Sequence, residues 1–272
     1  MSTKFASTDL KIKMTDGAEF IFWFDGNGKI TVDSAFDNPK PNAFSLVQVQ
    51  DCPFATSVCK SACYVHNLEK AEREIHEKYR VNSNAIRAIL ANFDYYVETK
   101  KRFVEWISEN CKTGFRWHVS GDIISLNHAV FIASVSEMVP HVNFWIYTRS
   151  FPFLGPFEGI ENLVVNLSAD SDNWEQALAA HNKFCFRICY MTVDGKVPET
   201  MPEGSVIFPD YNLRGRNLLV KTDSPWWQSL RPEQKKMVCP PDFFGQSEHL
   251  RCGPCKKCLV RSPHEEALRY RS

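Results

Sequence analysis

Seven of the ten cysteines fall into two compact groups that suit metal binding. Cys52, Cys59 and Cys63 belong to the first group, in the stretch CPFATSVCKSACY. The second group lies near the C-terminus and comprises Cys239, Cys252, Cys255 and Cys258. Short peptide links between thiolates can direct several sulfurs at one soft metal centre. Both groups are therefore predicted to be metal ligands, most simply for iron–sulfur clusters.

The C-terminal group is compatible with more than one arrangement. Cys252, Cys255 and Cys258 have the C-x2-C-x2-C run of ferredoxin-type [4Fe-4S] ligation, and Cys239 supplies a fourth ligand. Zinc held by four cysteines is the alternative, although such close steps crowd a tetrahedral ion more than a cubane cluster. In a third arrangement, one tail cysteine completes the N-terminal cluster and leaves no open iron. Disulfides are disfavoured, because clustered cysteines in a reducing compartment more often bind metal.

The remaining cysteines have a simpler interpretation. Cys185 and Cys189 alternate with apolar residues in a strand-like run, and Cys111 ends a helical pattern. Small buried thiols of this kind usually serve core packing. These three are predicted to be core residues.

Composition limits the classes of partner. The chain has 272 residues, 44% hydrophobic content and a net charge of +0, so one main globular domain with appendages is expected. A neutral chain has no overall field that would attract nucleic acid or an anionic membrane. The N-terminus lacks the apolar segment of a signal peptide, and the apolar runs are too short to span a bilayer. We expect a cytoplasmic protein without membrane contact.

Alternating strand-like and helix-like runs predict an α/β fold. The strand-like runs are 44–50, 115–119, 143–147, 162–167, 184–190 and 206–208, with a further one at 217–221. Helix-like stretches at 126–138 and 173–181 separate several of them. This order indicates parallel βα units, and their number favours a complete or partial TIM-like barrel over an open sheet.

Other elements flank this core. An N-terminal β-hairpin is predicted within residues 10–33, turning at 25–28. Helices are predicted between residues 67 and 110, one of them capped by Asn82 or Ser83, and another from Ser224 to about Met237. The predicted domains are the hairpin extension (1–43), the barrel with the cysteine loop (44–238) and the Cys-rich tail (239–272).

Polar residues follow the predicted strands, where parallel βα folds place functional groups. They are His118, Ser120, Gly121, Asp122, Arg149, Asn166, Ser168, Asp170, Arg187, Tyr190, Asp210, Arg214 and Arg216. We expect them to surround one barrel mouth that binds a small polar or anionic ligand, with His118, Asp122 and Arg149 as catalytic candidates. The alternative is that Asp122, Asp170 and Asp210 neutralise the cations internally. His118 could equally form an ordinary hydrogen bond, and Asp122 could cap the next helix in competition with Ser125.

Several motifs together resemble a phage family. They are CPFATSVCKSACY at 52–64, HVSGD at 118–122, FWIYTRS at 144–150 and the Cys-rich tail. In this order they are similar to the phage "gene product eighty-eight" family, and the resemblance covers roughly residues 44–258. It implies a bacteriophage protein located in the host cytoplasm.

A second resemblance is to radical S-adenosylmethionine enzymes. In that superfamily three cysteines after the first barrel strand hold a [4Fe-4S] cluster whose open iron binds S-adenosylmethionine. Cys52, Cys59 and Cys63 match in number and place, and Ser120-Gly121-Asp122 stands where the superfamily has a Gly-Gly-Glu-type motif. The spacing C-x6-C-x3-C departs from the usual C-x3-C-x2-C and is closer to a related phage family with C-x6-C-x2-C followed by Tyr.

The resemblance leaves two functional hypotheses. In the first, the protein is an enzyme, with Ser120, Gly121, Asp122 and Asn166 or Ser168 near S-adenosylmethionine. In the second, a fully ligated cluster serves stability, electron transfer or redox-sensitive binding to a host protein. The two hypotheses differ in how many coordination positions on the cluster are not occupied by cysteine.

Overall fold

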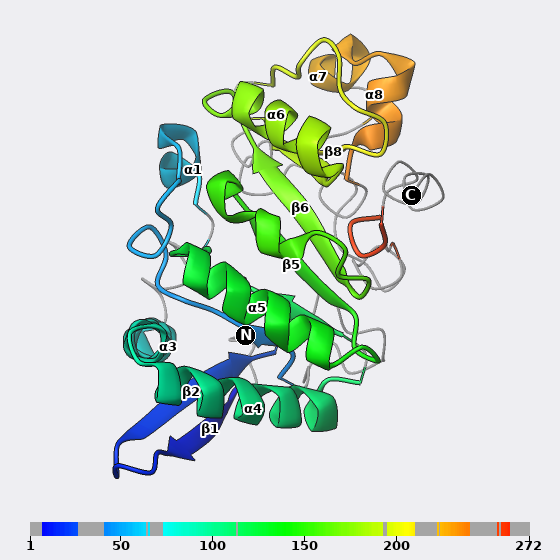
Figure 1. The fold of residues 1–272 in the computed structure, drawn as a ribbon. Coiled ribbons are helices and arrows are strands. Elements are labelled where there is room, and N and C mark those ends of the chain that lie inside the picture. The colour runs from blue at the N-terminus through cyan, green and yellow to red at the C-terminus, as the bar shows by residue number, and fades with distance from the viewer. Residues whose placement is uncertain are drawn as a thin grey trace. The chain divides into compact units, whose positions relative to one another are not determined.

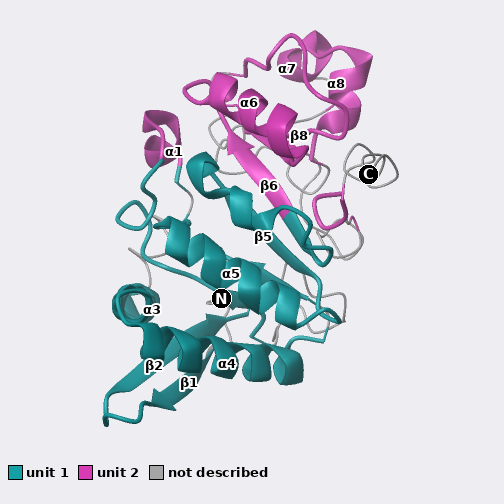
Figure 2. Cartoon of the chain, in the orientation of Figure 1, with its two compact units in different colours: residues 1–54, 63–164 teal, residues 55–62, 165–272 magenta. Residues whose placement is uncertain are grey.

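The structure is a computed structural model of the 272-residue chain. It describes residues 7–26, 41–63, 65, 73–112, 114–192, 195–209, 222, 224–239, 255 and 257–261 (Figure 1). The fold is mixed α/β. The chain divides into two compact units: unit 1 comprises residues 1–54 and 63–164, and unit 2 comprises residues 55–62 and 165–272 (Figure 2).

Unit 1 contains an antiparallel hairpin followed by parallel strands. Its strands are β1 (Ser7–Lys13), β2 (Glu19–Asp25), β3 (Ala43–Phe44), β4 (Phe115–Trp117) and β5 (Phe144–Thr148). β2 pairs antiparallel with both β1 and β3, whereas β4 pairs parallel with β3 and with β5. The carboxyl ends of β3, β4 and β5 therefore lie at the same edge of the sheet.

The N-terminal hairpin turns earlier than the sequence suggested. β2 ends at Asp25, and residues 27 and 28 of the predicted turn at 25–28 lie outside the described residues. The turn that joins β1 and β2 lies between Met14 and Ala18, where the Met14 amide donates to the Ala18 carbonyl (2.8 Å) and Gly17 adopts a φ of +90°. Both stretches contain Asp-Gly, so turn chemistry alone could not distinguish them.

The described residues of unit 1 include three long helices. They are α3 (Arg73–Leu90), α4 (Phe93–Asn110) and α5 (Leu126–Met138), followed by the short 3-10 helices η1 (Phe151–Phe153) and η2 (Gly155–Phe157). The predicted helix start at Asn82 or Ser83 is wrong, because both residues lie inside α3. The Asn82 side chain donates to the carbonyls of Trp23 (2.8 Å) and Ser45 (2.9 Å). These polar residues attach α3 to the sheet instead of capping a helix.

A cluster of aromatic side chains forms the centre of unit 1. Phe22, Phe44, Phe103 and Trp117 are fully buried, and their rings come from β2, β3, α4 and β4. The ring centroids of Phe22 and Phe103 are 4.9 Å apart, and those of Phe44 and Phe103 are 5.5 Å apart, both edge to face. Such packing fixes α4 against the strands and thereby positions the loops that follow β3 and β4.

The described part of unit 2 contains three parallel strands. Its elements are α1 (Ser57–Ser61), β6 (Leu163–Ala169, in unit 2 from Val165 onward), α6 (Trp174–Phe184), β7 (Arg187–Met191), β8 (Val206–Phe208), α7 (Pro225–Ser229) and α8 (Pro232–Met237). β7 pairs parallel with both β6 and β8.

Two local predictions in unit 2 need correction. The strand expected at 184–190 begins only at Arg187, because Cys185 ends α6 in the left-handed conformation (φ 60°). The single helix expected from Ser224 to Met237 is two helices, since Leu230 and Arg231 are extended before Pro232 starts α8. Proline disfavours helical backbone in the residue before it, which accounts for the break. The strand predicted at 217–221 lies outside the described residues, and barrel closure stays a prediction.

Candidate functional site

The predicted motif Ser120-Gly121-Asp122 packs against the chain that leads to the cysteine loop in unit 1. The Leu46 amide donates to the Ser120 carbonyl (2.9 Å), and the Asp122 amide donates to the Asp51 carbonyl (2.8 Å). Gly121 has a φ of +76°, and a Cβ added there would lie 2.6 Å from the Leu46 Cβ. Glycine is therefore required for this close approach of two backbone segments.

Asp51 organises the turn that precedes Cys52. Its buried carboxylate accepts from the Val47 amide (3.2 Å) and forms an ion pair with Arg87 of α3. Its carbonyl accepts the hydrogen bond from Asp122 described above. Asp51 was not identified as a site residue from the sequence. The one feature of the sequence that could have indicated a role is its position beside Cys52.

The Asp122 carboxylate joins the ends of two neighbouring strands. It accepts from the Thr148 hydroxyl (2.6 Å), the Arg149 amide (2.8 Å) and the Ile123 amide (2.8 Å). Burial raises the pKa of Asp122, while these hydrogen bonds and the Arg149 charge act in the opposite direction. The helix α5 is capped by Ser125, so Asp122 does not serve as the cap.

His118 is strained and buried at the end of β4. Its φ is 57°, and neither ring nitrogen has a hydrogen-bond partner among the described residues. Its ring centroid lies 5.2 Å from that of His128 in α5. Burial, then the charges of His128 and Arg116, lower the pKa of His118 well below its ordinary value, and burial lowers that of His128 to about 3. Unit 1 therefore contains a pair of neutral imidazoles at physiological pH. His128 was missed because it lies within an otherwise apolar helical run.

The cysteines of the N-terminal loop are all half-buried. Cys52 and Cys63 belong to unit 1, where the Cys63 thiol donates to the Gln48 side chain (3.1 Å). Cys59 belongs to unit 2 and lies on α1. All three predicted ligands thus lie among the described residues, two of them in unit 1 and one in unit 2.

Within unit 2, the start of α1 is attached to the loop that follows β6. Thr56 caps α1 by accepting from the Cys59 amide (2.9 Å), and its hydroxyl donates to Asp170 (2.6 Å). Asp172 accepts from the Ser57 hydroxyl, and its own amide donates to Asp170 (3.0 Å). Asp170, predicted to compensate strand-end cations, in this way fixes the backbone that carries Cys59.

The tail lies on the face of β6 and β7 that carries Asn166 and Arg187. The Asn166 amide group donates to the Cys258 carbonyl (3.1 Å), and the Arg187 guanidinium donates to the carbonyls of Val260 (2.8 Å) and Gly204 (3.0 Å). These two strand residues are direct partners in the register of β6 and β7. Both were predicted to face a ligand, and in the structure they bind the backbone of the tail. Ser168, another predicted ligand residue, accepts at its carbonyl from Asn173 (3.1 Å).

The described tail cysteines gather near a strand cysteine. Cys239 and Cys258 are buried, Cys255 is half-buried, and Cys252 lies outside the described residues. Cys189, predicted to be a plain core residue, is 3% exposed and lies beside Cys258 and Cys239. Burial raises the pKa of the Cys189 thiol well above its ordinary value, and Cys258 and Cys239 raise it further.

The donor chemistry of this region fits a thiolate-bound metal. Cys189, Cys239, Cys255 and Cys258 offer only sulfur, which iron–sulfur clusters and structural zinc both accept. Within the described part of the chain, no three His, Cys, Asp or Glu side chains are already arranged as a coordination group. Metal binding would therefore have to draw these thiols closer together or include Cys252.

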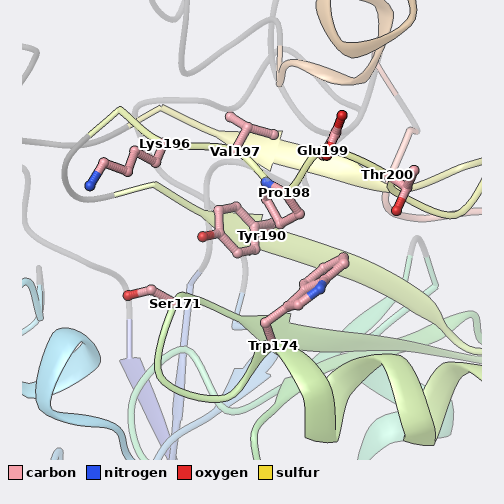
Figure 3. Close-up of a pocket in the computed structure, with 8 residues that line it drawn as sticks. All are labelled: Ser171, Trp174, Tyr190, Lys196, Val197, Pro198, Glu199 and Thr200. Carbon is pink, nitrogen blue, oxygen red and sulfur yellow. The ribbon is translucent and has the colours of Figure 1, made fainter.

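A separate open pocket of about 320 Å³ lies at the carboxyl ends of β6 and β7 in unit 2. The rings of Trp174 and Tyr190 meet edge to face at 5.6 Å, and the segment 196–200 completes the wall (Figure 3). Lys196 and Glu199 supply its charged groups. Of the predicted strand-end residues, Tyr190 is the one that lines this pocket. Arg214, Arg216 and Asp210 lie outside the described residues.

These features define a mixed α/β protein whose parallel strands carry polar groups at their carboxyl ends and a thiol-rich tail on one face. Residues 21–261 match the sequence model of the family described as Gene product 88, so the chain belongs to that family. It is similar to the Gene 88 protein of Mycobacterium phage L5, with 27% identity over 192 residues, which cover 68% of this chain and 74% of the phage protein. No solved structure matches the chain. The phage family predicted from the motifs is thereby confirmed. None of the described helices is long and apolar enough to cross a membrane.

Proposed function

We propose that the protein is an iron–sulfur protein whose C-terminal cysteines hold a [4Fe-4S] cluster against the strands of unit 2. The observation that supports this most strongly is the hydrogen bond from Asn166 to the Cys258 carbonyl, because it fixes a tail cysteine at a buried strand face. Arg187 fixes the tail two residues later, at Val260. The strands thus supply one fixed anchor at the last cysteine and a second one two residues after it.

The charge balance of this region supports a metal. Thiolates that are buried close together repel one another, and they also lose their hydration. A multinuclear iron centre offsets both costs, because the sulfurs bind it as anions. The tail is also poor in apolar residues, so metal binding supplies free energy for its ordering. Zinc is the alternative with the same ligands.

Chelation combined with limited proteolysis tests the structural part of this proposal. Anaerobically purified protein should resist cleavage after residue 239, and a chelator or Cys255→Ser should make the tail cleavable before the rest of the chain. The matched control is Cys111→Ser, which changes a buried thiol in unit 1 that donates to the Pro41 carbonyl. A tail that is equally protected with and without metal would mean that ordinary packing holds it.

A second candidate function is an S-adenosylmethionine-dependent reaction at the N-terminal loop. The hydrogen bond from Asp122 to the Asp51 carbonyl favours it, because the motif resembling Gly-Gly-Glu then lies beside Cys52. In the superfamily that the motif resembles, a cluster held by three loop cysteines supplies an open iron that chelates the amino and carboxylate groups of S-adenosylmethionine.

The chain's own contribution to such a site would be the placement of Asp122. Its Oδ1 already accepts from Thr148 and Ile123, whereas among the described residues Oδ2 accepts from Arg149 alone. Oδ2 is therefore the oxygen with capacity for an amino group. Titrating reduced, anaerobic protein with S-adenosylmethionine should change its electron paramagnetic resonance spectrum and yield 5′-deoxyadenosine. An unchanged spectrum with no cleavage product would leave the non-catalytic role, in electron transfer or redox-sensitive binding of a host protein.

A further inference from the structure

Backbone pairing brings cysteines from distant parts of the sequence together in unit 2. Cys189 on β7 lies opposite Val206 on β8 in parallel register. The next β8 residue, Ile207, forms a parallel bridge with Val238, and its carbonyl accepts from the Cys239 amide (2.8 Å). Cys239 therefore lies directly beside β8, next to this isolated bridge.

Side-chain alternation determines which way these residues face. Ile207 and Val238 pack together in a buried apolar cluster with Trp226 and Leu230. Successive side chains on a strand point to opposite faces, so Val206 and Cys239 face away from this cluster. Cys189 faces the same side as its register partner Val206. The two cysteines thus share one face, which is the face that Asn166 and Arg187 also occupy.

Cys258 reaches this face through contacts of the tail. The Asn166 side chain binds the Cys258 carbonyl and also accepts from the Cys189 thiol (3.6 Å). The Lys257 ammonium donates to the Val238 carbonyl (3.4 Å), so residues 257 and 258 lie against residues 238 and 239. The thiol of Cys258 is within hydrogen-bonding reach of that of Cys189.

We infer that Cys189 is a ligand of the tail metal and shares it with Cys239, Cys255 and Cys258. This inference rests on the proposed function. A role in core packing accounts for the burial of Cys189 but not for the convergence of thiols from β7, the segment after α8 and the tail. A metal held by these cysteines would cross-link the three segments, so its binding would stabilise the strands of unit 2 as well as the tail.

Metal content of single and double variants tests the inference. The variants are Cys189→Ser, Cys189→Ala, Cys258→Ser and the double variant Cys189→Ser/Cys258→Ser, with Cys185→Ser as the matched control four residues away. Iron, zinc and acid-labile sulfide per chain are measured on full-length protein purified without oxygen. Circular dichroism confirms that each variant is folded, and the alanine variant preserves a small buried side chain.

We expect Cys189→Ser, Cys189→Ala and Cys258→Ser to lose the same amount of metal, and the double variant to lose no more than either single variant. Cys185→Ser should keep the wild-type content. If Cys189→Ala is folded and keeps its full metal content while Cys258→Ser loses metal, Cys189 is not a ligand. The proposed function would remain intact in that case. Equal metal in Cys258→Ser and the wild type would instead overturn the proposed function itself. If the protein contains zinc instead of iron, and the same variants lose it, the result would still support Cys189 as a ligand.

Discussion

The side-chain amide of Asn166 donates a hydrogen bond to the carbonyl of Cys258, which lies 92 residues later in the sequence. Both groups are buried, and the same side chain accepts from the Cys189 thiol through its oxygen. One strand residue thus connects a tail cysteine with a strand cysteine. The contribution of this connection to stability can be measured directly.

Asn166→Asp should loosen the tail. Aspartate still accepts from Cys189 but cannot donate to the Cys258 carbonyl, and a buried acceptor left without its donor costs about 1–3 kcal/mol. Limited proteolysis should therefore cleave the tail several-fold faster in this variant. The control is Asn110→Asp, which alters an exposed asparagine that donates to the Trp106 carbonyl. Similar cleavage rates in the two variants would argue against Asn166 as an anchor.

The pair His118 and His128 should make unit 1 sensitive to acid. The folded-state pKa of His128 is about 3 against an ordinary 6.5, so the unfolded chain binds a proton first as the pH falls. The stabilising contribution of neutral His128 is fully present above about pH 6.5. It is lost as the pH falls toward 3, at up to about 1.4 kcal/mol per pH unit. Between pH 7 and pH 5.5, wild-type protein should lose about 1 kcal/mol more stability in urea unfolding than His128→Gln.

Asp25 changes the stability with pH in the direction opposite to His128, because burial raises the pKa of Asp25 from 3.8 to about 6. A raised carboxyl pKa adds stability as the pH falls from about 6 toward 3.8. Asp25 is present in both proteins, so its effect cancels in the difference between wild type and His128→Gln. A difference that does not change with pH would contradict a neutral, buried His128.

Gly121→Ala should be more destabilising than an ordinary change of glycine to alanine. A Cβ would meet the Leu46 Cβ at 2.6 Å, and the φ of +76° is itself unfavourable for alanine. We expect a loss of about 2–4 kcal/mol in the free energy of unfolding, the sum of backbone strain and overpacking.

Gly17→Ala is the matched control for this prediction. Its φ is +90°, but a Cβ there has nothing within 4 Å, so backbone strain alone should cost about 1 kcal/mol. Equal losses in thermal or urea unfolding would mean that the two backbone segments at Gly121 are not closely packed.

Thr56→Val should expose Cys59. The change removes the cap on the Cys59 amide and the hydrogen bond to Asp170, and a lost N-cap costs about 0.5–2 kcal/mol. Alkylation of Cys59 should then be several-fold faster, as followed by mass spectrometry of the labelled peptide. Thr56→Ser keeps the hydroxyl and should react at the wild-type rate. Unchanged labelling of Cys59 in Thr56→Val would show that the cap does not hold α1.

Local sequence patterns predicted the elements whose cues are local. The helix 126–138 matches α5 at both ends, because Ser125 caps its first turn, and the strand 206–208 matches β8. Some of the failures involve residues whose partners are distant in sequence. Asn82 has the composition of a cap, but carbonyls of Trp23 and Ser45 receive its hydrogen bonds.

The candidate sites follow the same rule. The predicted tail ligands were visible as a spaced motif, and in unit 1 the strand-end residues Asp122 and Thr148 are joined by a hydrogen bond. Cys189 carried no such signal, because it lies 50 residues before Cys239 in an apolar run. Only the register of β7 with β8 brings it beside the tail.

The most direct test of the iron–sulfur proposal is the iron and acid-labile sulfide content of full-length wild-type protein purified without oxygen. Thiolate groups of this kind suit a soft multinuclear centre, so the protein should be brown and contain iron and sulfide in equal amounts. Cys258→Ser should contain less of both, and Cys111→Ser should match the wild type. Colourless protein that carries only zinc, or no metal, would contradict the central claim.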